Sequence, residues 1–186
     1  MNSTFGPGIA KYTQEENLKA HYAQNPNYYS PISWETVHFL QQKIPAEAFL
    51  NVLDLCCGTG WFASWVKNTY HGFVIGVDYC EQRIKIAQSM DNAPVFFHWD
   101  VYYYLEWTDT ERSLITIFDG LEHLKHPEEI VNRAKELSPL VVATVPIDMP
   151  YVAHLQVFPD EQSVEDKFGP TDIERWGRHF FCTWRR

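Results

Sequence analysis

The feature that most constrains the fold is an apolar run at 51–55 (NVLDL) that leads directly into a glycine-rich turn. Glycines at 58 and 60 let the backbone pass close to a ligand, because neither carries a Cβ atom. A second apolar run at 73–77 ends on Asp78, 18 residues after Gly60. A crossover of this length returns an acid to the edge of a parallel sheet, where it can bind a ribose diol. The pattern predicts a nucleoside-binding βαβ unit.

Asp54, the acid inside the first apolar run, distinguishes between a dinucleotide and a nucleoside ligand without phosphate. In 58–63 (GTGWFA), Ala63 replaces the third glycine of a dinucleotide fingerprint, and dinucleotide binders also accept alanine there. A pyrophosphate at a helix N-terminus favours positive potential, so Asp54 would repel it. A ligand with an amino cation suits this carboxylate, and S-adenosylmethionine has an ammonium, a sulfonium and a ribose but no phosphate. The alternative is an ordinary strand-turn-helix with an acid that caps the helix.

Four ordered segments resemble class I S-adenosylmethionine-dependent methyltransferases, and in particular their small-molecule branch. Residues 53–60 (LDLCCGTG) resemble motif I, and 74–78 (VIGVD) resemble the second strand with its ribose-binding acid. Residues 96–100 (FFHWD) are similar to the strand end whose acid contacts the adenine amino group. Residues 117–128 (IFDGLEHLKHPE) resemble the segment after the fourth strand. The match runs in order over about residues 50 to 146 and is therefore more specific than any one motif.

The resemblance implies an α/β fold: one doubly wound, Rossmann-like domain with a mostly parallel seven-stranded sheet and an antiparallel last strand. The alternation of strand-like and helix-like segments along the chain agrees with this architecture. Strands are expected at 51–55, 73–77, 94–99, 113–118 and 140–145, and helices at 61–67, 81–90 and 127–137.

The two ends of the chain are less regular. We expect an N-terminal helical or lid segment at 1–48, with helical patterns at 13–23 and 33–43, and a methyltransferase core at 49–186. Residues 12–32 carry four tyrosines and are predicted to fold over the cofactor as a lid, although a surface helix is the competing interpretation. Residues 172–176 and 179–184 are expected to form a hairpin around Gly177.

Composition indicates which classes of partner and which cellular compartment suit this chain. The 186 residues carry a net charge of −9 and a pI near 5.3, which disfavours nucleic acid because phosphate contacts dominate its affinity. The four cysteines form no C-x-x-C pair, which indicates reduced thiols rather than a zinc or disulfide site. The chain shows neither a leader pattern nor an apolar run of about 18 residues. We expect a cytoplasmic protein without a membrane span, and the sequence leaves the oligomeric state open.

The expected site lies beyond the carboxyl ends of the strands, as in other open α/β sheets. Its loops are those at 56–61, 78–80, 99–102, 118–124 and 146–156, where acids and histidines are concentrated. The expected cofactor is S-adenosyl-L-methionine, with S-adenosyl-L-homocysteine as its product. The residues expected to bind it are Asp54, Cys56, Gly58, Gly60, Trp61, Asp78, Tyr79, Arg83, Asp100, Val101 and Phe118.

Methyl transfer from a sulfonium is an in-line displacement, so the protein mainly aligns donor and acceptor and removes at most one proton. Histidine is the natural proton acceptor near neutral pH. We expect His123 to take this role, with His154 as the second choice and Asp119 as the third catalytic residue. A turn or helix-capping role for His123 is the competing interpretation.

Asp119, Glu122 and His123 also form a D-x-x-E-H pattern, whose carboxylates and imidazole could hold a divalent cation on one turn. Related patterns with glutamate at the first place bind magnesium in quinone O-methyltransferases and in small-RNA 3′-end 2′-O-methyltransferases. Asp119 is one methylene shorter, and aspartate at this place is ordinary in members thought to lack a metal. We therefore assign no metal, and the metal-bound state remains the alternative.

The predicted function is methyl transfer to a small-molecule or sugar-type acceptor. DNA-base amino-methyltransferases carry an Asn/Asp-Pro-Pro-Tyr/Phe segment after the fourth strand, whereas this chain has Phe118-Asp119-Gly120-Leu121. Methylation of oxygen or carbon is therefore favoured over methylation of a base nitrogen. The alternatives are a cofactor-binding partner subunit without activity, an enzyme that cleaves the cofactor, and a metal-assisted RNA-end 2′-O-methyltransferase.

Overall fold

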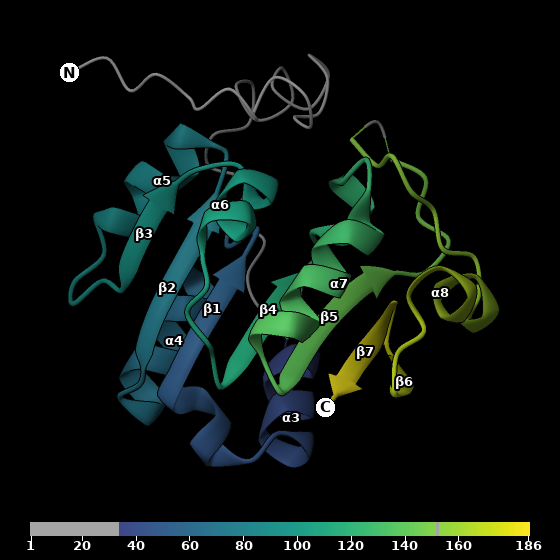
Figure 1. Ribbon diagram of the computed structural model, residues 1–186, viewed down its shortest axis with the longest axis horizontal. Coiled ribbons are helices and arrows are strands. Elements are labelled where there is room, and N and C mark those ends of the chain that lie inside the picture. Colours follow the sequence, from purple (N-terminus) through teal and green to yellow (C-terminus); the bar gives the residue numbers. More distant parts are fainter. Residues whose placement is uncertain (1–33, 152) are drawn as a thin grey trace.

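A computed structural model describes residues 34–151 and 153–186. Its centre is one seven-stranded sheet with the strand order β3-β2-β1-β4-β5-β7-β6 (Figure 1). Strands β1 to β5 pair in parallel, and β7 runs antiparallel to both of its neighbours. The strands are β1 Asn51–Leu55, β2 Phe73–Asp78, β3 Val95–His98, β4 Leu114–Phe118, β5 Leu140–Pro146, β6 Asp172–Trp176 and β7 His179–Arg185. The predicted fold class is confirmed.

Helices cover both faces of this sheet. The helices are α3 Trp34–Lys43, α4 Trp61–Tyr70, α5 Glu81–Gln88, α6 Val101–Trp107, α7 Pro127–Leu137 and α8 Glu161–Phe168, with short 3-10 helices η1 Ala46–Leu50 and η2 Leu121–His123. Buried side chains of α6, α7 and α8 share one hydrophobic cluster with the sheet. Those of α3, η1, α4 and α5 share a second cluster on the opposite face. The molecule is therefore a three-layer sandwich, as Figure 1 shows.

The apolar runs of the sequence become strands that are buried on both faces. In β1, Leu53 and Leu55 belong to the first cluster and Val52 to the second, because successive side chains point to opposite sides of a sheet. All seven residues of β5 are buried. Parallel strands covered on both faces read as continuous apolar runs, which is why these segments were recognisable in the sequence.

Helix α6 was not predicted. Residues 101–107 (VYYYLEW) are rich in aromatic side chains, and we expected a loop at 99–102 rather than the start of α6. Asp100 begins this helix, because its carboxylate accepts a hydrogen bond of 2.8 Å from the backbone N–H of Tyr102. Burial of Tyr104 and Leu105 against the sheet then outweighs the weak helix preference of aromatic residues.

The remaining expectations differ mainly at element ends. The helix after the glycine turn extends to Tyr70, and the hairpin of β6 and β7 forms as predicted. The predicted helix at 13–23 and the lid at 12–32 lie outside the described residues. Residues 34–50 pack on the second cluster, where the rings of Phe39 and Phe181 are 4.5 Å apart. The division of the chain into 1–48 and 49–186 stays a prediction.

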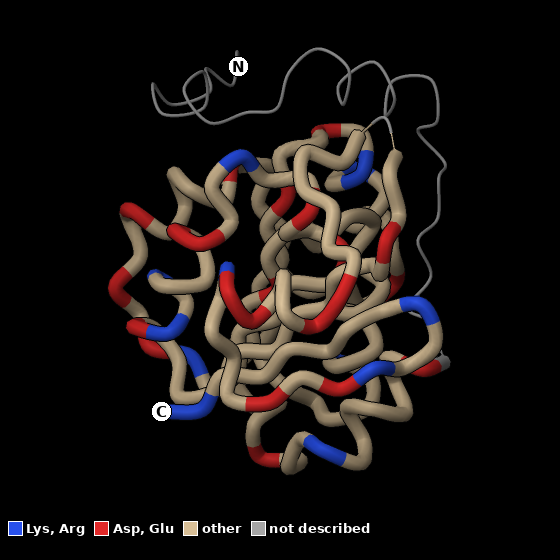
Figure 2. The backbone as a smooth tube through the Cα atoms, turned by 90° about the vertical axis from the view of Figure 1, so that its right-hand side faces the viewer, with Lys and Arg blue, Asp and Glu red and all other residues tan. Residues whose placement is uncertain are grey.

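The described residues carry charges of both signs on the surface (Figure 2) and four free cysteines. In Figure 2, acidic segments occur from the top to the bottom of the molecule, with basic segments scattered among them. All four cysteines lie within the described residues and are free thiols. None of the helices in the described part of the chain is long and apolar enough to cross a membrane.

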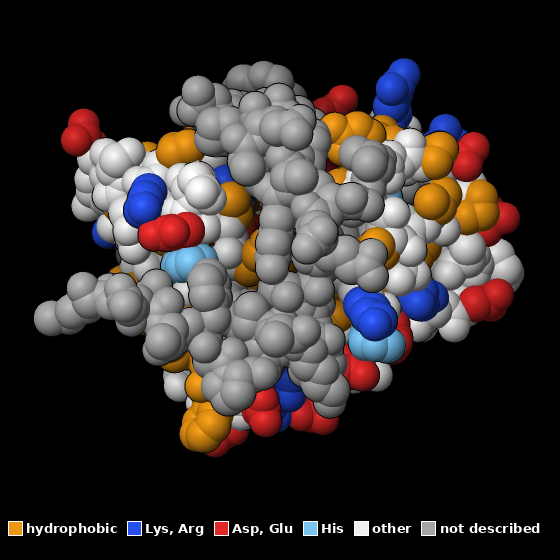
Figure 3. Space-filling view, turned by 90° about the horizontal axis from the view of Figure 1, so that it is seen from above, with side chains coloured by type: hydrophobic (Ala, Val, Ile, Leu, Met, Phe, Trp, Pro, Cys, Tyr) orange, Lys and Arg blue, Asp and Glu red, His pale blue; other side chains and the backbone are white. Residues whose placement is uncertain are grey.

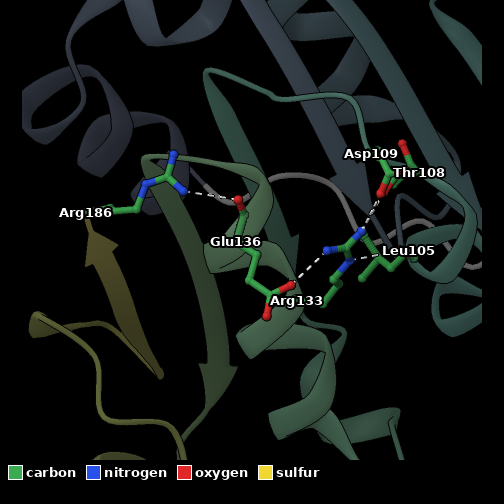
Figure 4. A network of polar contacts seen from close by, with 6 residues as sticks. All are labelled: Leu105, Thr108, Asp109, Arg133, Glu136 and Arg186. Atoms are coloured by element: carbon green, nitrogen blue, oxygen red, sulfur yellow. Dashed lines mark hydrogen bonds and ion pairs between the residues drawn. The ribbon is translucent and has the colours of Figure 1, made fainter.

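Arg133 of α7 ties this helix to the end of α6 (Figure 4). Its guanidinium donates to the backbone carbonyls of Leu105 at 3.1 Å and Thr108 at 2.8 Å, and also contacts the carboxylates of Asp109 and Glu136. The two carbonyls are fixed in space, whereas the two carboxylates are largely exposed to solvent. The bonds to the backbone therefore carry most of the stabilisation, because exposed ion pairs contribute little.

We predict that Arg133→Met lowers the free energy of unfolding by about 1–2 kcal/mol, since two carbonyls lose a charged donor. Glu136→Gln and Asp109→Asn are the matched controls and should each change it by less than about 0.5 kcal/mol. Glu136→Gln also leaves the backbone carbonyl that accepts from Arg186 intact. Urea unfolding followed by circular dichroism measures all three, and equal losses for Arg133→Met and Asp109→Asn would contradict this assignment.

Candidate functional site

The candidate site lies along one edge of the sheet. Strands β1 to β5 are parallel, so their carboxyl ends meet at that edge, and Figure 3 looks down onto it. Acidic, histidine and hydrophobic side chains are all visible around this face. The five predicted loops therefore come together, and the strand order places them in the sequence β3, β2, β1, β4, β5. This edge is where open α/β sheets bind ligands.

Asp78, at the end of β2, is braced by two backbone amides. Its Oδ2 accepts from the N–H of Gly58 at 2.9 Å, and its Oδ1 accepts from the N–H of Cys80 at 2.8 Å. The side chain is 5% exposed. The carboxylate thus joins the glycine turn after β1 to the loop after β2. The two bonds hold the carboxylate in a fixed position.

The two glycines of the turn have different physical roles. Gly58 and Gly60 both have positive φ, at +55° and +77°. A Cβ added at Gly58 would meet only Arg83 Nη1, at an ordinary 3.5 Å. A Cβ added at Gly60 would lie 2.4 Å from Phe96 and 2.8 Å from Ala87, which is too close. The fold therefore requires Gly60, whereas Gly58 leaves open the side that a ligand can approach.

Asp54 is a buried acid one residue before the end of β1. It is 2% exposed, and its Oδ1 accepts a 2.8 Å hydrogen bond from the hydroxyl of Thr116 on β4. Burial, more than the neighbouring charge of Asp78, raises the pKa of Asp54 to about 7. A cationic ligand would stabilise its charged form. The sequence did not reveal Thr116 as its partner, because the two positions meet only through strand pairing.

Asp100 and Val101 lie beyond β3. The carboxylate of Asp100 caps α6, and burial raises its pKa to about 6. Val101 is buried in the first hydrophobic cluster. Asp54, Asp78 and Asp100 thus lie at the carboxyl ends of three neighbouring strands. Three acids in a row match the polar groups of an amino-acid nucleoside and repel a phosphate.

The other predicted cofactor residues surround this row. Trp61 is 45% exposed at the start of α4, and the ring of Phe118 packs edge-on against Phe62 at 4.9 Å. Tyr79 packs with Cys80 against Ala153, so the loop after β5 reaches the loop after β2. Cys56 has a positive φ of 58°, and burial raises the pKa of its thiol. The thiol therefore stays protonated near neutral pH.

His123 and His154 meet at the other half of the edge. The ring nitrogen Nδ1 of His123 contacts the carbonyl of Ala153 at 2.9 Å, and Nδ1 of His154 contacts the carbonyl of Met149 at 2.7 Å. The two rings lie edge to face, with centroids 4.9 Å apart. Burial lowers the pKa of His123 to about 4. A neutral ring results, which can accept a proton but is a weak base.

Asp119 belongs to a different set of contacts from these histidines. Its Oδ1 accepts from the hydroxyl of Thr144 at 2.8 Å and lies 3.3 Å from Nε2 of His179. Its backbone φ is +46°. The group of side chains in the described residues that could hold a metal ion is Glu122, His123 and His154, whereas the sequence pattern that we considered as an alternative contained Asp119 and not His154. Sequence spacing could not indicate His154 as the third member, because it comes from the loop after another strand.

The edge fits S-adenosylmethionine on its β1–β3 side. The open side of Gly58 allows close approach of a ligand to the backbone, and Asp78 and Asp100 are placed for hydroxyl and amino groups. Asp54 can balance an amino cation. The predicted roles of these residues remain proposals, but the donors, acceptors and charges present are those that this cofactor requires.

Comparisons with known proteins agree with this geometry. A family model described as a methyltransferase domain matches residues 19–168. No curated protein shows significant sequence similarity to the chain. Solved structures do show similarity of fold.

Three of these structures illustrate the similarity. Magnesium protoporphyrin IX methyltransferase from Synechocystis PCC 6803, solved with bound S-adenosylmethionine, is 14% identical with a TM-score of 0.60, over 93% of this chain and 98% of that one. An S-adenosylmethionine-dependent methyltransferase from Mesorhizobium loti is 14% identical with a TM-score of 0.62, over 83% and 99%. The plantazolicin methyltransferase BamL is 16% identical with a TM-score of 0.51, over 71% and 57%.

Cofactor affinity should depend on pH through Asp54. Its folded pKa of about 7 lies above the unfolded value of 3.8, so the free protein gains a proton there as pH falls below 7. A bound amino cation favours the carboxylate, so binding releases this proton. We predict that affinity for S-adenosylmethionine rises by up to about tenfold per unit between pH 5 and 7 and then levels off. Calorimetry measures the slope.

Asp54→Asn is the control for this pH dependence, because it removes the proton while keeping an acceptor for Thr116. The variant should bind more weakly above pH 7 and show a flatter profile below it. Asp100 also titrates in this range, so a slope that persists in Asp54→Asn would assign the effect to Asp100 instead.

The two glycines should respond differently to alanine. Gly58→Ala should cost about 1–2 kcal/mol of stability through left-handed strain alone, yet weaken cofactor binding at least about tenfold. Gly60→Ala should cost roughly 1–3 kcal/mol more, because its Cβ also overlaps Phe96 and Ala87. Urea unfolding and calorimetry separate the two effects. Wild-type affinity in Gly58→Ala would remove this turn from the cofactor site.

Proposed function

The chain belongs to the methyltransferase-domain family, and we propose that this S-adenosylmethionine-dependent enzyme methylates an oxygen or carbon atom of a small-molecule or sugar-type acceptor. Membership and cofactor follow from the family match and from the fold shared with enzymes solved with S-adenosylmethionine or S-adenosylhomocysteine. What we propose is the chemical class of the acceptor and the residues that bind it.

One observation carries the proposal: the edge of the sheet is divided by chemistry. The ends of β3, β2 and β1 carry only carboxylates among the predicted acids and histidines, whereas the segments after β4 and β5 carry two neighbouring imidazoles beside the carboxylates of Asp119 and Glu122. A cofactor held on the carboxylate half leaves the imidazole half for the acceptor. His123 and His154 are therefore the proposed acceptor-side residues, with Asp119 at their flank.

Each half would contribute a different part of the reaction. The cofactor supplies an electrophilic methyl group on a sulfonium. Asp78 and Asp100 would hold its nucleoside, and Asp54 would balance its amino group. On the acceptor side, His123 has a neutral ring and can take a proton from a reacting hydroxyl, although its lowered pKa makes it a weak base. Alignment of the acceptor would contribute more than proton transfer.

The class of acceptor is supported by charge and by the neighbours. A chain of net charge −9 is a poor partner for polyanions. Two structural neighbours are named as methyltransferases of magnesium protoporphyrin IX and of plantazolicin, neither of which is a nucleic acid. Both considerations favour a small molecule for this chain.

The test is to incubate the enzyme with fractions of cell extract and S-adenosylmethionine radiolabelled on its methyl group. We expect label to appear in an acceptor of low molecular mass, with one S-adenosylhomocysteine formed per methyl group. Label recovered in RNA or in protein would reject the small-molecule proposal. Loss of the cofactor to other breakdown products, without a labelled acceptor, would indicate cofactor cleavage instead.

Once an acceptor is known, His123→Ala should lower kcat by about 10²–10⁴-fold and leave cofactor affinity nearly unchanged. His126→Ala is the matched control, because His126 lies in the same segment and its ring nitrogen Nδ1 is 3.7 Å from the carboxylate of Glu128. Its kcat should equal that of the wild type. Normal turnover of His123→Ala would assign this residue to the structure of the turn.

A further inference from the structure

Glu122, His123 and His154 form a compact group of metal-ligand atoms. One such atom from each residue lies within 4.8 Å of the other two. Glu122 and His123 come from η2, and His154 comes from the loop after β5. The sequence analysis assigned no metal and considered Asp119 in place of His154. The structure therefore offers a different set of ligands from the one first considered.

Both imidazoles are oriented as metal ligands usually are. Each places Nδ1 against a backbone carbonyl, that of Ala153 for His123 and that of Met149 for His154. A carbonyl can only accept, so Nδ1 carries the hydrogen and Nε2 keeps its lone pair. Metal-binding histidines typically donate their second ring N–H in this way, which fixes the tautomer and the orientation of the ring.

Glu122 supplies an observation that points to a cation. Its side chain is 2% exposed, and Oε2 is buried without a hydrogen-bond partner. Oε1 is 3.7 Å from Nε2 of His123, beyond hydrogen-bond distance. Buried carboxylates are normally paired or bound to a metal, because loss of solvation is costly. Oε2 has no such partner among the described residues.

The backbone holds the ligand group together. The carbonyl of Glu122 accepts from the amides of Leu155 at 2.8 Å and Gln156 at 3.1 Å. The side-chain amide of Gln156 also donates to the carbonyl of Leu124 at 3.2 Å. The loop that carries His154 is thereby fastened to η2. The ligands are preorganised by contacts that no metal needs to create.

We propose that Glu122, His123 and His154 bind a divalent transition-metal ion such as Zn²⁺ through two imidazole nitrogens and one carboxylate oxygen. Imidazole nitrogen favours Zn²⁺ and its first-row neighbours over Mg²⁺. Bonds of about 2.0–2.2 Å would bring the ligand atoms to roughly 3.4 Å from one another, a contraction of about an ångström. Three protein ligands leave a coordination position open, as in catalytic rather than structural sites.

The proposed metal site is a separate property from methyl transfer, but a bound metal would change how the two histidines act in that reaction. A metal-bound Nε2 has no lone pair for a proton, so in the loaded enzyme the two histidines would be ligands rather than bases. A hydroxyl at the open position would lose its proton more easily, because the ion lowers its pKa. Metal binding is measured without an acceptor, so its test and the test of the proposed function fail independently.

The experiment is titration of the untagged full-length protein, stripped with a chelator, with Co²⁺ and then Zn²⁺. We expect one Co²⁺ per chain, with a visible absorption spectrum that Zn²⁺ displaces. His154→Gln and Glu122→Gln should each weaken metal binding by about 100-fold or more. Mutation of a residue that only hydrogen-bonds to a metal ligand already lowers metal affinity by about 10–100-fold, and loss of a ligand should lower it further. Wild-type protein that binds neither ion, or unchanged binding in both variants, would overturn the proposal.

His126→Gln is the matched control. Its Nδ1 lies 3.7 Å from Glu128, the same separation as between His123 and Glu122, but no third ligand is present there in the described residues. This variant should bind Co²⁺ as the wild type does, and equal weakening would show that binding is not at the proposed site. Circular dichroism in the presence of chelator tests whether each variant is folded.

A measurement on the wild type avoids any dependence on variants that fold poorly. X-ray absorption of the zinc-loaded protein should show two imidazole ligands and one carboxylate oxygen. A coordination shell with sulfur from Cys56 or Cys57, or without imidazole, would place the ion elsewhere and reject the assignment.

Discussion

Parallel pairing of β1 to β5 brings five strand ends to a single edge of the sheet, and every group of the candidate site depends on this constraint. Parallel strands need crossovers, and the crossovers here are the helices that bury the sheet on both faces. The loops that follow these strands therefore lie next to one another at that edge. Residues as far apart in the sequence as Asp54 and His154 thus come to the same end of the sheet.

Negative charge at this edge is costly for the fold and useful for a cationic ligand. Asp54 and Asp78 lie near the carboxyl ends of β1 and β2 and are almost fully buried. Asp78 recovers part of the cost through the amides of Gly58 and Cys80, whereas Asp54 accepts from the hydroxyl of Thr116. The pKa of Asp54 is raised accordingly. The protein holds its carboxylates in place in advance, and a cation would complete their solvation.

The loop after β5 sets the chemistry of the other half of the edge. Ala153 packs on Cys80 and accepts from His123, and Leu155 donates to the carbonyl of Glu122. These contacts fasten the loop at two places and hold His154 beside His123. A buried carboxylate and two imidazoles then share one small space. Proton acceptance and metal binding are the two uses to which such a group is suited, and the proposed metal site distinguishes them by experiment.

The sequence by itself determined the sheet, its glycine turn and the row of acids, because each is written in a short, continuous pattern. An apolar run predicts a buried strand. The position of Asp78 at the end of such a run also places it at the carboxyl end of β2 in the structure. Only the tertiary structure decided which partners these acids have and that His154 joins Glu122. Thr116 lies 62 residues from Asp54, and no local pattern records a pairing between strands. Helix α6 was missed for the same reason, since burial against the sheet overrides the strand preference of its aromatic residues. Secondary-structure propensity depends on residues that are close in the sequence, whereas the site is formed by tertiary contacts between residues that are far apart in it.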